Sequence, residues 1–187
     1  MVKIIIGLVG EFGTGKGTAA AYLNKKYKAR ILKFSAVLND ILHRLHYEVT
    51  RDNLDRIVTT LRKEFGEDVL AKTLLADIDA DKKNKIIVID GFRKLEELQV
   101  FKKISGFTLI NLTASPRTRY ERLLKRNEKR DDQKKSFKNF LREHKNISDK
   151  DIIKVGKRAD FAIDNSGTAK ELYSQIDKII KKINEKK

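Results

Sequence analysis

The fold of this chain is most constrained by a glycine-rich segment that separates an apolar run from an alanine-rich run. The apolar residues 3–9 predict a buried strand, and the alanines after the glycines favour a helix. The segment itself is Gly10-Glu11-Phe12-Gly13-Thr14-Gly15-Lys16-Gly17-Thr18. Strand, glycine-rich turn and helix are the context of a phosphate-binding P-loop, and the spacing from Gly10 to Lys16 matches that motif.

The residue types in this loop suit phosphate binding. Glycines let the backbone form a concave set of N–H donors, and the first helical turn adds unpaired N–H groups with partial positive charge. Lys16 would reach the outer phosphates as a mobile cation. Gly17 replaces the usual Ser or Thr, so Thr18 is the nearest hydroxyl for a magnesium ion. The predicted phosphate-binding residues are Gly10, Gly13, Thr14, Gly15, Lys16, Gly17 and Thr18.

The composition narrows the class of protein. A length of 187 residues fits one domain with small inserted subdomains, and no apolar run approaches membrane-spanning length. The absence of cysteine excludes disulfides, thiol catalysis and cysteine metal sites. The first strand begins at once, without the layout of a signal peptide, so we expect a cytoplasmic monomer or homodimer with no membrane partner.

The net charge of +16 comes from 42 basic and 26 acidic residues. Such a field attracts polyanions, which include nucleotides, coenzyme A-like phosphates and nucleic acid. The charge supports an anionic substrate without choosing one. A nucleic-acid partner is compatible with it but is not favoured, because the chain lacks the aromatic-rich basic strands of common RNA-binding modules.

The alternation of apolar and helical segments predicts an α/β fold. Further strands are expected at residues 30–34, 85–90, 107–112 and 161–164. Helical patterns lie between them, so we expect a three-layer P-loop NTPase fold with a five-stranded parallel sheet flanked by helices. The site should lie at the carboxyl ends of the strands.

Two long polar intervals predict helical insertions in this core. The first covers residues 35–81, and the second, at 117–147, is dense in Arg and Lys. The single domain 1–187 would then have its core at residues 1–34, 82–116 and 148–187.

The third predicted strand ends in Asp90-Gly91-Phe92-Arg93. A carboxylate at a strand tip beside the P-loop can orient magnesium or its waters, and Arg93 could clamp an acceptor phosphate. The alternative is a surface turn in which Asp90 caps the next helix.

A basic helix is predicted at 117–126. Arg119, Arg122 and Arg126 are spaced by three and four residues and so share one side of it. The alternative is a solvated basic helix.

The P-loop sequence Gly-x-x-Gly-x-Gly-Lys-Gly-Thr resembles the adenylate kinase and nucleoside monophosphate kinase families. Asp-Gly-Phe-Arg resembles their Asp-Gly-Phe-Pro-Arg segment without the proline, and residues 129–133 resemble the Arg-Lys-Asp-Asp-Gln end of an adenylate kinase lid with the basic pair swapped. The resemblance implies that the 35–81 insertion binds the acceptor and that 117–147 is a lid. It also implies that Arg122 and Arg126 act on ATP.

The reaction implied is transfer of the γ-phosphoryl group of Mg-ATP to a nucleoside monophosphate. The catalytic residues would be Lys16, Asp90, Arg122 and Arg126, with Thr18 and Asp90 at the metal. Ser35 follows the second strand, where these kinases place small polar residues at the acceptor phosphate, although a helix cap is an equal alternative. The favoured acceptor arginine is Arg62, and its rivals are Arg44, Arg51 and Arg56.

The segment from Ala159 to Thr168 resembles dephospho-coenzyme A kinase instead. Its Asn-Ser-Gly, beginning at Asn165, would offer backbone groups to an adenine edge; a turn with a helix cap at Thr168 is the alternative. Dephospho-coenzyme A kinase is therefore the second candidate function. An ATP-regulated nucleic-acid-binding ATPase, suggested by the charge, is the third.

Overall fold

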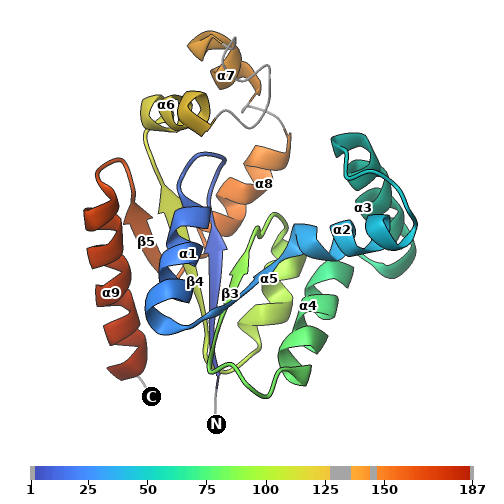
Figure 1. Cartoon of the computed structure of the whole chain (residues 1–187), viewed down its shortest axis with the longest axis horizontal. Coiled ribbons are helices and arrows are strands. Elements are labelled where there is room, and N and C mark those ends of the chain that lie inside the picture. Colours follow the sequence, from blue (N-terminus) through green and yellow to red (C-terminus); the bar gives the residue numbers. More distant parts are fainter. Residues whose placement is uncertain (1–2, 127–135, 144–146, 186–187) are drawn as a thin grey trace.

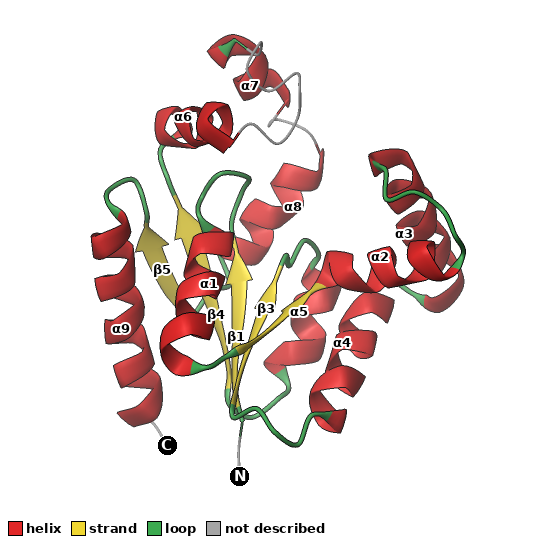
Figure 2. Ribbon diagram, viewed as in Figure 1, coloured by secondary structure: helices red, strands yellow, loops and turns green. Residues whose placement is uncertain are grey.

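A computed structural model describes residues 3–126, 136–143 and 147–185, without the side chains of residues 126, 143 and 147–150. Its five strands form one parallel sheet in the order β2-β3-β1-β4-β5 (Figure 2). The strands are β1 (Ile4–Val9), β2 (Arg30–Lys33), β3 (Ile86–Asp90), β4 (Phe107–Thr113) and β5 (Phe161–Asp164). The predicted α/β fold and the five parallel strands are confirmed.

The second strand is one residue shorter than expected. Phe34 is the first residue of helix α2 (Phe34–Arg44) instead of the last residue of β2. Its ring is buried and packs edge-on against Phe92, with the ring centroids 5.0 Å apart. This contact with a residue far along the chain outweighs the β propensity of phenylalanine.

Helices cover both faces of the sheet (Figure 1). Helices α1 (Lys16–Tyr27) and α9 (Ala169–Glu185) pack on one face, where the side chains of Ile4, Ile6 and Leu8 from β1 meet them. The opposite face of β1 packs into a second core, which helices α2, α4, α5 and α8 complete. The further bounds are α4 (Val69–Ala80), α5 (Leu95–Lys102) and α8 (Ile147–Gly156).

The remaining helices lie beyond the strand ends. Helix α3 (Arg51–Phe65) projects beside α2 at the edge of the molecule and has no fully buried residue (Figure 1). Thr50 caps α3 by accepting a hydrogen bond from the N–H of Asn53 at 3.2 Å. Helices α6 (Pro116–Arg126) and α7 (Phe137–Glu143) lie above the carboxyl ends of the strands. Among the described residues, no helix combines the length and apolarity needed to cross a membrane.

Candidate nucleotide-binding site

The P-loop joins β1 to α1 at the carboxyl end of the central strand. Gly10, Gly13 and Gly15 have φ angles of 152°, 79° and 93°, in the region that favours glycine. A Cβ on Gly10 would lie 2.2 Å from the carbonyl oxygen of Leu112, so a side chain there would collide with the neighbouring strand. The buried Thr14 hydroxyl donates to the carbonyl of Glu11 at 2.8 Å and closes the turn. The glycines and Thr14 therefore allow the loop to take this shape against the neighbouring strand.

Lys16 is the first residue of α1, and Gly15 is its N-cap. The Nζ atom donates to the carbonyl oxygens of Gly10 at 2.7 Å and Glu11 at 3.1 Å, so the ammonium lies across the start of the loop. Glycine has no side chain to cap the first-turn N–H groups, and the first turn contains no acidic residue. The loop therefore combines a cation with N–H donors, an arrangement suited to phosphate.

Gly17 and Thr18 are exposed on the first turn of α1. A Cβ on Gly17 would have no heavy atom within 4 Å, and its φ lies outside the positive range. The fold itself therefore does not require glycine after the lysine.

Asp90 ends β3 and is in register with Leu8 of β1 and Lys33 of β2. Burial raises the pKa of the Asp90 carboxyl, and the positive charges of Lys16, Lys33 and Arg93 oppose the increase. Its Oδ1 is buried without a hydrogen-bond partner among the described residues. The structure thus brings the predicted carboxylate to the P-loop lysine.

A magnesium ion here would have few protein ligands. No group of three His, Cys, Asp or Glu side chains that could hold a metal occurs among the described residues. One unpartnered carboxylate oxygen and an exposed hydroxyl fit a magnesium ion that keeps most of its waters and binds through phosphate.

Arg122 joins α6 to the P-loop. Its Nη1 donates to the carbonyl of Gly13 at 3.3 Å, and its Nη2 donates to the carbonyl of Asn165 at 2.7 Å. The predicted arginine is therefore at the phosphate-binding loop. Arg126 is the last residue of α6, but its side chain, residues 129–133 and part of the predicted lid lie outside the described residues.

Asn165, which follows β5, supports the P-loop from the other side. Its side chain is 4% exposed, and Nδ2 donates to the carbonyl of Thr14 at 2.9 Å. A Cβ on Gly15 would lie 2.2 Å from that nitrogen. Because the Asn165 N–H also donates to Thr113 and its carbonyl accepts from Arg122, both backbone groups are already engaged. They are therefore not open to an adenine edge in this conformation.

The helix cap at Thr168, the alternative interpretation of this segment, is present. Its hydroxyl accepts from the N–H of Glu171 at 3.3 Å, and the Glu171 carboxylate accepts from the N–H of Thr168 at 2.7 Å. This reciprocal pair is a capping box at the start of α9.

The acceptor candidates gather around a residue that sequence reasoning missed. Glu97 of α5 is 1% exposed; its Oε1 pairs with Nη2 of Arg62 at 2.8 Å, and its Oε2 accepts from the N–H of Arg93 at 2.8 Å. Glu97 is the third residue of α5 after the N-cap Lys94, and its Oε2 also accepts from the N–H of Lys94 at 3.1 Å; an acidic residue in the first helical turn was the available signal. The structure therefore joins Arg62 to the Asp90–Arg93 segment.

The other acceptor candidates lie on exposed parts of the chain. Ser35 is exposed in the first turn of α2, and the Arg93 side chain is exposed. The rival arginines Arg44, Arg51 and Arg56 are exposed as well.

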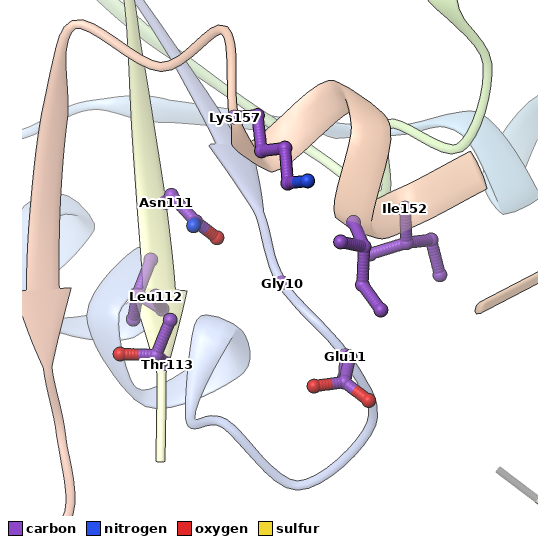
Figure 3. A pocket seen from close by; sticks show the side chains of 8 residues that line it. Gly10, Glu11, Asn111, Leu112, Thr113, Ile152 and Lys157 are labelled. Atoms are coloured by element: carbon purple, nitrogen blue, oxygen red, sulfur yellow. The ribbon is translucent and has the colours of Figure 1, made fainter. Parts of the chain in front are cut away.

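A small cavity lies behind the P-loop, on the side of α8 (Figure 3). Its volume is about 160 Å³. Its lining comes from Gly10, Glu11, Asn111, Leu112, Thr113, Ile152, Ile153 and Lys157. The buried Gly156 makes room for the amide of Asn111, because an added Cβ would lie 2.9 Å from Nδ2.

The parallel sheet, its helical layers and the P-loop at the end of β1 define an α/β protein with a P-loop NTPase fold. A family model described as an AAA domain matches residues 6–153. The chain belongs to this family and, more particularly, to the UPF0200 proteins. It is 30% identical over 188 residues to a UPF0200 protein of Methanocaldococcus jannaschii, across 96% of this chain and 90% of that protein. It is 33% identical over 186 residues to one of Staphylothermus marinus, across 99% and 96%.

Solved structures show the same fold at low sequence identity. A shikimate kinase from Bacteroides thetaiotaomicron has a TM-score of 0.61 at 14% identity, covering 97% of this chain and 98% of that one. The protein TT1252 from Thermus thermophilus has a TM-score of 0.57 at 19% identity, with the same coverage of both chains. At these identities the likeness concerns the fold alone.

Proposed function

We propose that this protein is an ATP-dependent phosphotransferase that moves the γ-phosphoryl group of Mg-ATP to a nucleoside monophosphate. The observation that carries the proposal is the position of Lys16. Its Nζ lies 2.7 Å from the carbonyl of Gly10, above a glycine loop with uncapped helix N–H groups, and its charge acts on Asp90 at the neighbouring strand tip. A cation, N–H donors and a carboxylate at one strand edge suit phosphoryl transfer, which depends on positioning and charge stabilisation.

The positions of the site residues suggest a separate role for each in binding ATP and magnesium. Lys16 would leave the loop carbonyls for the β- and γ-phosphates, and Arg122 would exchange its carbonyl partners for phosphate oxygens. Magnesium, when bound near Thr18 and Asp90, supplies charge neutralisation on the phosphates. Arg126 is assigned to the ATP-binding residues only because it lies four residues after Arg122 on the same helix.

The acceptor phosphate would lie beside Arg93, with Ser35 and Arg62 at the same end of the sheet. The guanidinium of Arg62 already forms an ion pair with Glu97, at 2.8 Å. The exposed side chain of Arg93 is therefore the better candidate to bind the acceptor phosphate. A monophosphate oxygen is already anionic, so this reaction needs no base.

A second candidate, dephospho-coenzyme A kinase, is favoured by the state of Asp90. A hydroxyl acceptor must lose a proton, and a carboxylate whose pKa is raised by burial is the stronger base for that proton. Its Oδ1, which has no hydrogen-bond partner in the described part of the chain, would accept that proton. Asp90 would then be a catalytic residue in the strict sense.

An acceptor screen distinguishes the two candidates. Ribo- and deoxyribonucleoside monophosphates and dephospho-coenzyme A are each incubated with Mg-ATP, and ADP release and phosphorylated product are measured. Efficient transfer to a monophosphate supports the first candidate, whereas transfer to dephospho-coenzyme A alone supports the second. ATP hydrolysis without transfer to any acceptor would contradict both.

A further inference from the structure

The P-loop contains a carboxylate that phosphate binding does not call for. Glu11 lies directly after the first glycine of the loop, where its negative charge would repel nucleotide phosphates. In the structure its Oε2 forms an ion pair with Nη1 of Arg119 on α6, at 2.8 Å. The charge on the loop is therefore neutralised from a helix more than a hundred residues away.

Arg119 is firmly held in this position. The residue is 4% exposed, and its Nε donates to the carbonyl of Phe12 at 2.8 Å. Its guanidinium carbon lies 5.6 Å from the ring centroid of Phe140 on α7. A Cβ on Gly13 would lie only 3.0 Å from the carbonyl oxygen of Arg119, so the tip of the loop rests against its backbone.

Arg119 and Arg122 hold the loop in different ways. The guanidinium of Arg122 donates to the carbonyl oxygens of Gly13 and Asn165, so it can move toward phosphate without leaving an unpaired carboxylate behind. Arg119 meets a carboxylate, and moving it would leave Glu11 unpaired beside the phosphate site. The two neighbouring arginines therefore differ in what their loss would do.

We propose that Arg119 is a positioning residue for nucleotide binding, which neutralises Glu11 and fixes the P-loop tip through Phe12. The inference rests on the proposed ATP-binding function. It predicts that removing the charge of Arg119 weakens ATP binding, whereas removing the charge of Glu11 does not. Loss of Arg119 leaves a repelling carboxylate, whereas loss of the Glu11 charge leaves a buried cation that attracts phosphate.

The test is equilibrium binding of Mg-ATP to the full chain, measured by titration calorimetry. Arg119→Gln should raise the Kd for ATP at least about tenfold, because Glu11 then faces the phosphates unpaired. Glu11→Gln should leave the Kd unchanged or lower it. The double variant should bind more tightly than Arg119→Gln alone, since the repulsion is gone, although the hydrogen bond to Phe12 is still missing.

Controls separate this role from a general effect on the fold. Arg119→Lys retains the charge but cannot keep both the Glu11 pair and the hydrogen bond to Phe12, so its Kd should lie between those of wild type and Arg119→Gln. Arg117→Gln lies on the same helix, and its ion pair with Glu121 is exposed, so binding should not change. The unfolding midpoint of each variant is measured alongside.

Wild-type affinity in Arg119→Gln would overturn the inference, as would a double variant no better than Arg119→Gln alone. If Arg119→Gln does not fold, Glu11→Gln still decides, because a rise of about tenfold in its Kd contradicts the charge argument. A wild-type protein that does not bind ATP would instead remove the proposed function.

Discussion

The side-chain amide of Asn165 donates to the carbonyl of Thr14 at 2.9 Å and so ties the end of β5 to the P-loop, 151 residues away in the sequence. Both atoms are buried, and the same amide fills the space that a side chain on Gly15 would need. The shape of the phosphate-binding loop therefore depends on the C-terminal part of the chain as well as on its own glycines.

Asn165→Ala should destabilise the protein and weaken ATP binding together. The carbonyl of Thr14 loses its buried partner, which costs about 1–3 kcal/mol of the free energy of unfolding. The loosened loop should also raise the Kd for ATP. Denaturant unfolding and ATP titration measure the two effects, with the exposed Gln99→Ala as control. Unchanged stability in Asn165→Ala would show that the tie is dispensable.

Glu97→Gln should be strongly destabilising. The substitution breaks a pair whose carboxylate side chain is 1% exposed and leaves Arg62, among the described residues, with only the longer ion pair to Glu67, at 3.7 Å, at a cost of about 3 kcal/mol. The exposed Arg117–Glu121 pair provides the matched control, and Glu121→Gln should cost less than about 1 kcal/mol. Equal losses in the two variants, measured by denaturant unfolding, would contradict the account.

Asp90→Asn should increase the stability of the protein at neutral pH. Burial raises the pKa of Asp90 in the folded protein above its ordinary value of 3.8, so the folded state binds the proton more tightly than the unfolded state does. The wild type therefore loses stability as the pH rises from that ordinary value through the folded pKa, and the asparagine variant avoids this loss.

Unfolding experiments from pH 3 to pH 8, a range of about one unit below to four above the ordinary carboxyl pKa, test this sign. The stability gain of Asp90→Asn should shrink toward zero at the acid end. A gain that grows as the pH falls would mean that the carboxylate is stabilised in its charged form.

The strands and the P-loop could be predicted because their signals are local. Apolar runs and glycine spacing define them within short windows, so the structure moves only boundaries such as that at Phe34. The partners of the site side chains could not be predicted. Arg62 meets Glu97 across 35 residues, and Arg119 meets Phe12 across 107. Such contacts depend on how helices pack over the sheet, which no local pattern encodes.

The choice of Arg62 among four arginines illustrates the difference between local signals and long-range contacts. The helix period could place it near the glycine end of α3, and the structure then joins it to the Asp90–Arg93 segment through Glu97. The buried Glu97 could not be predicted as its counterion, because a glutamate in the first turn of a helix carries no sequence mark of a long-range partner. The role of Arg62 at an acceptor stays a prediction.

The central claim is that Lys16 and the loop glycines bind the phosphates of ATP for transfer, and Lys16→Ala tests it most directly. The variant should fold, since the lysine is only partly buried and its Nζ donates to the loop carbonyls of Gly10 and Glu11. Turnover should fall by at least about a hundredfold, because a cation at the transferring phosphoryl group is lost. Lys25→Ala, exposed on the same helix, is the control and should retain wild-type turnover. With an acceptor from the screen, near-wild-type transfer by a folded Lys16→Ala protein would contradict the account.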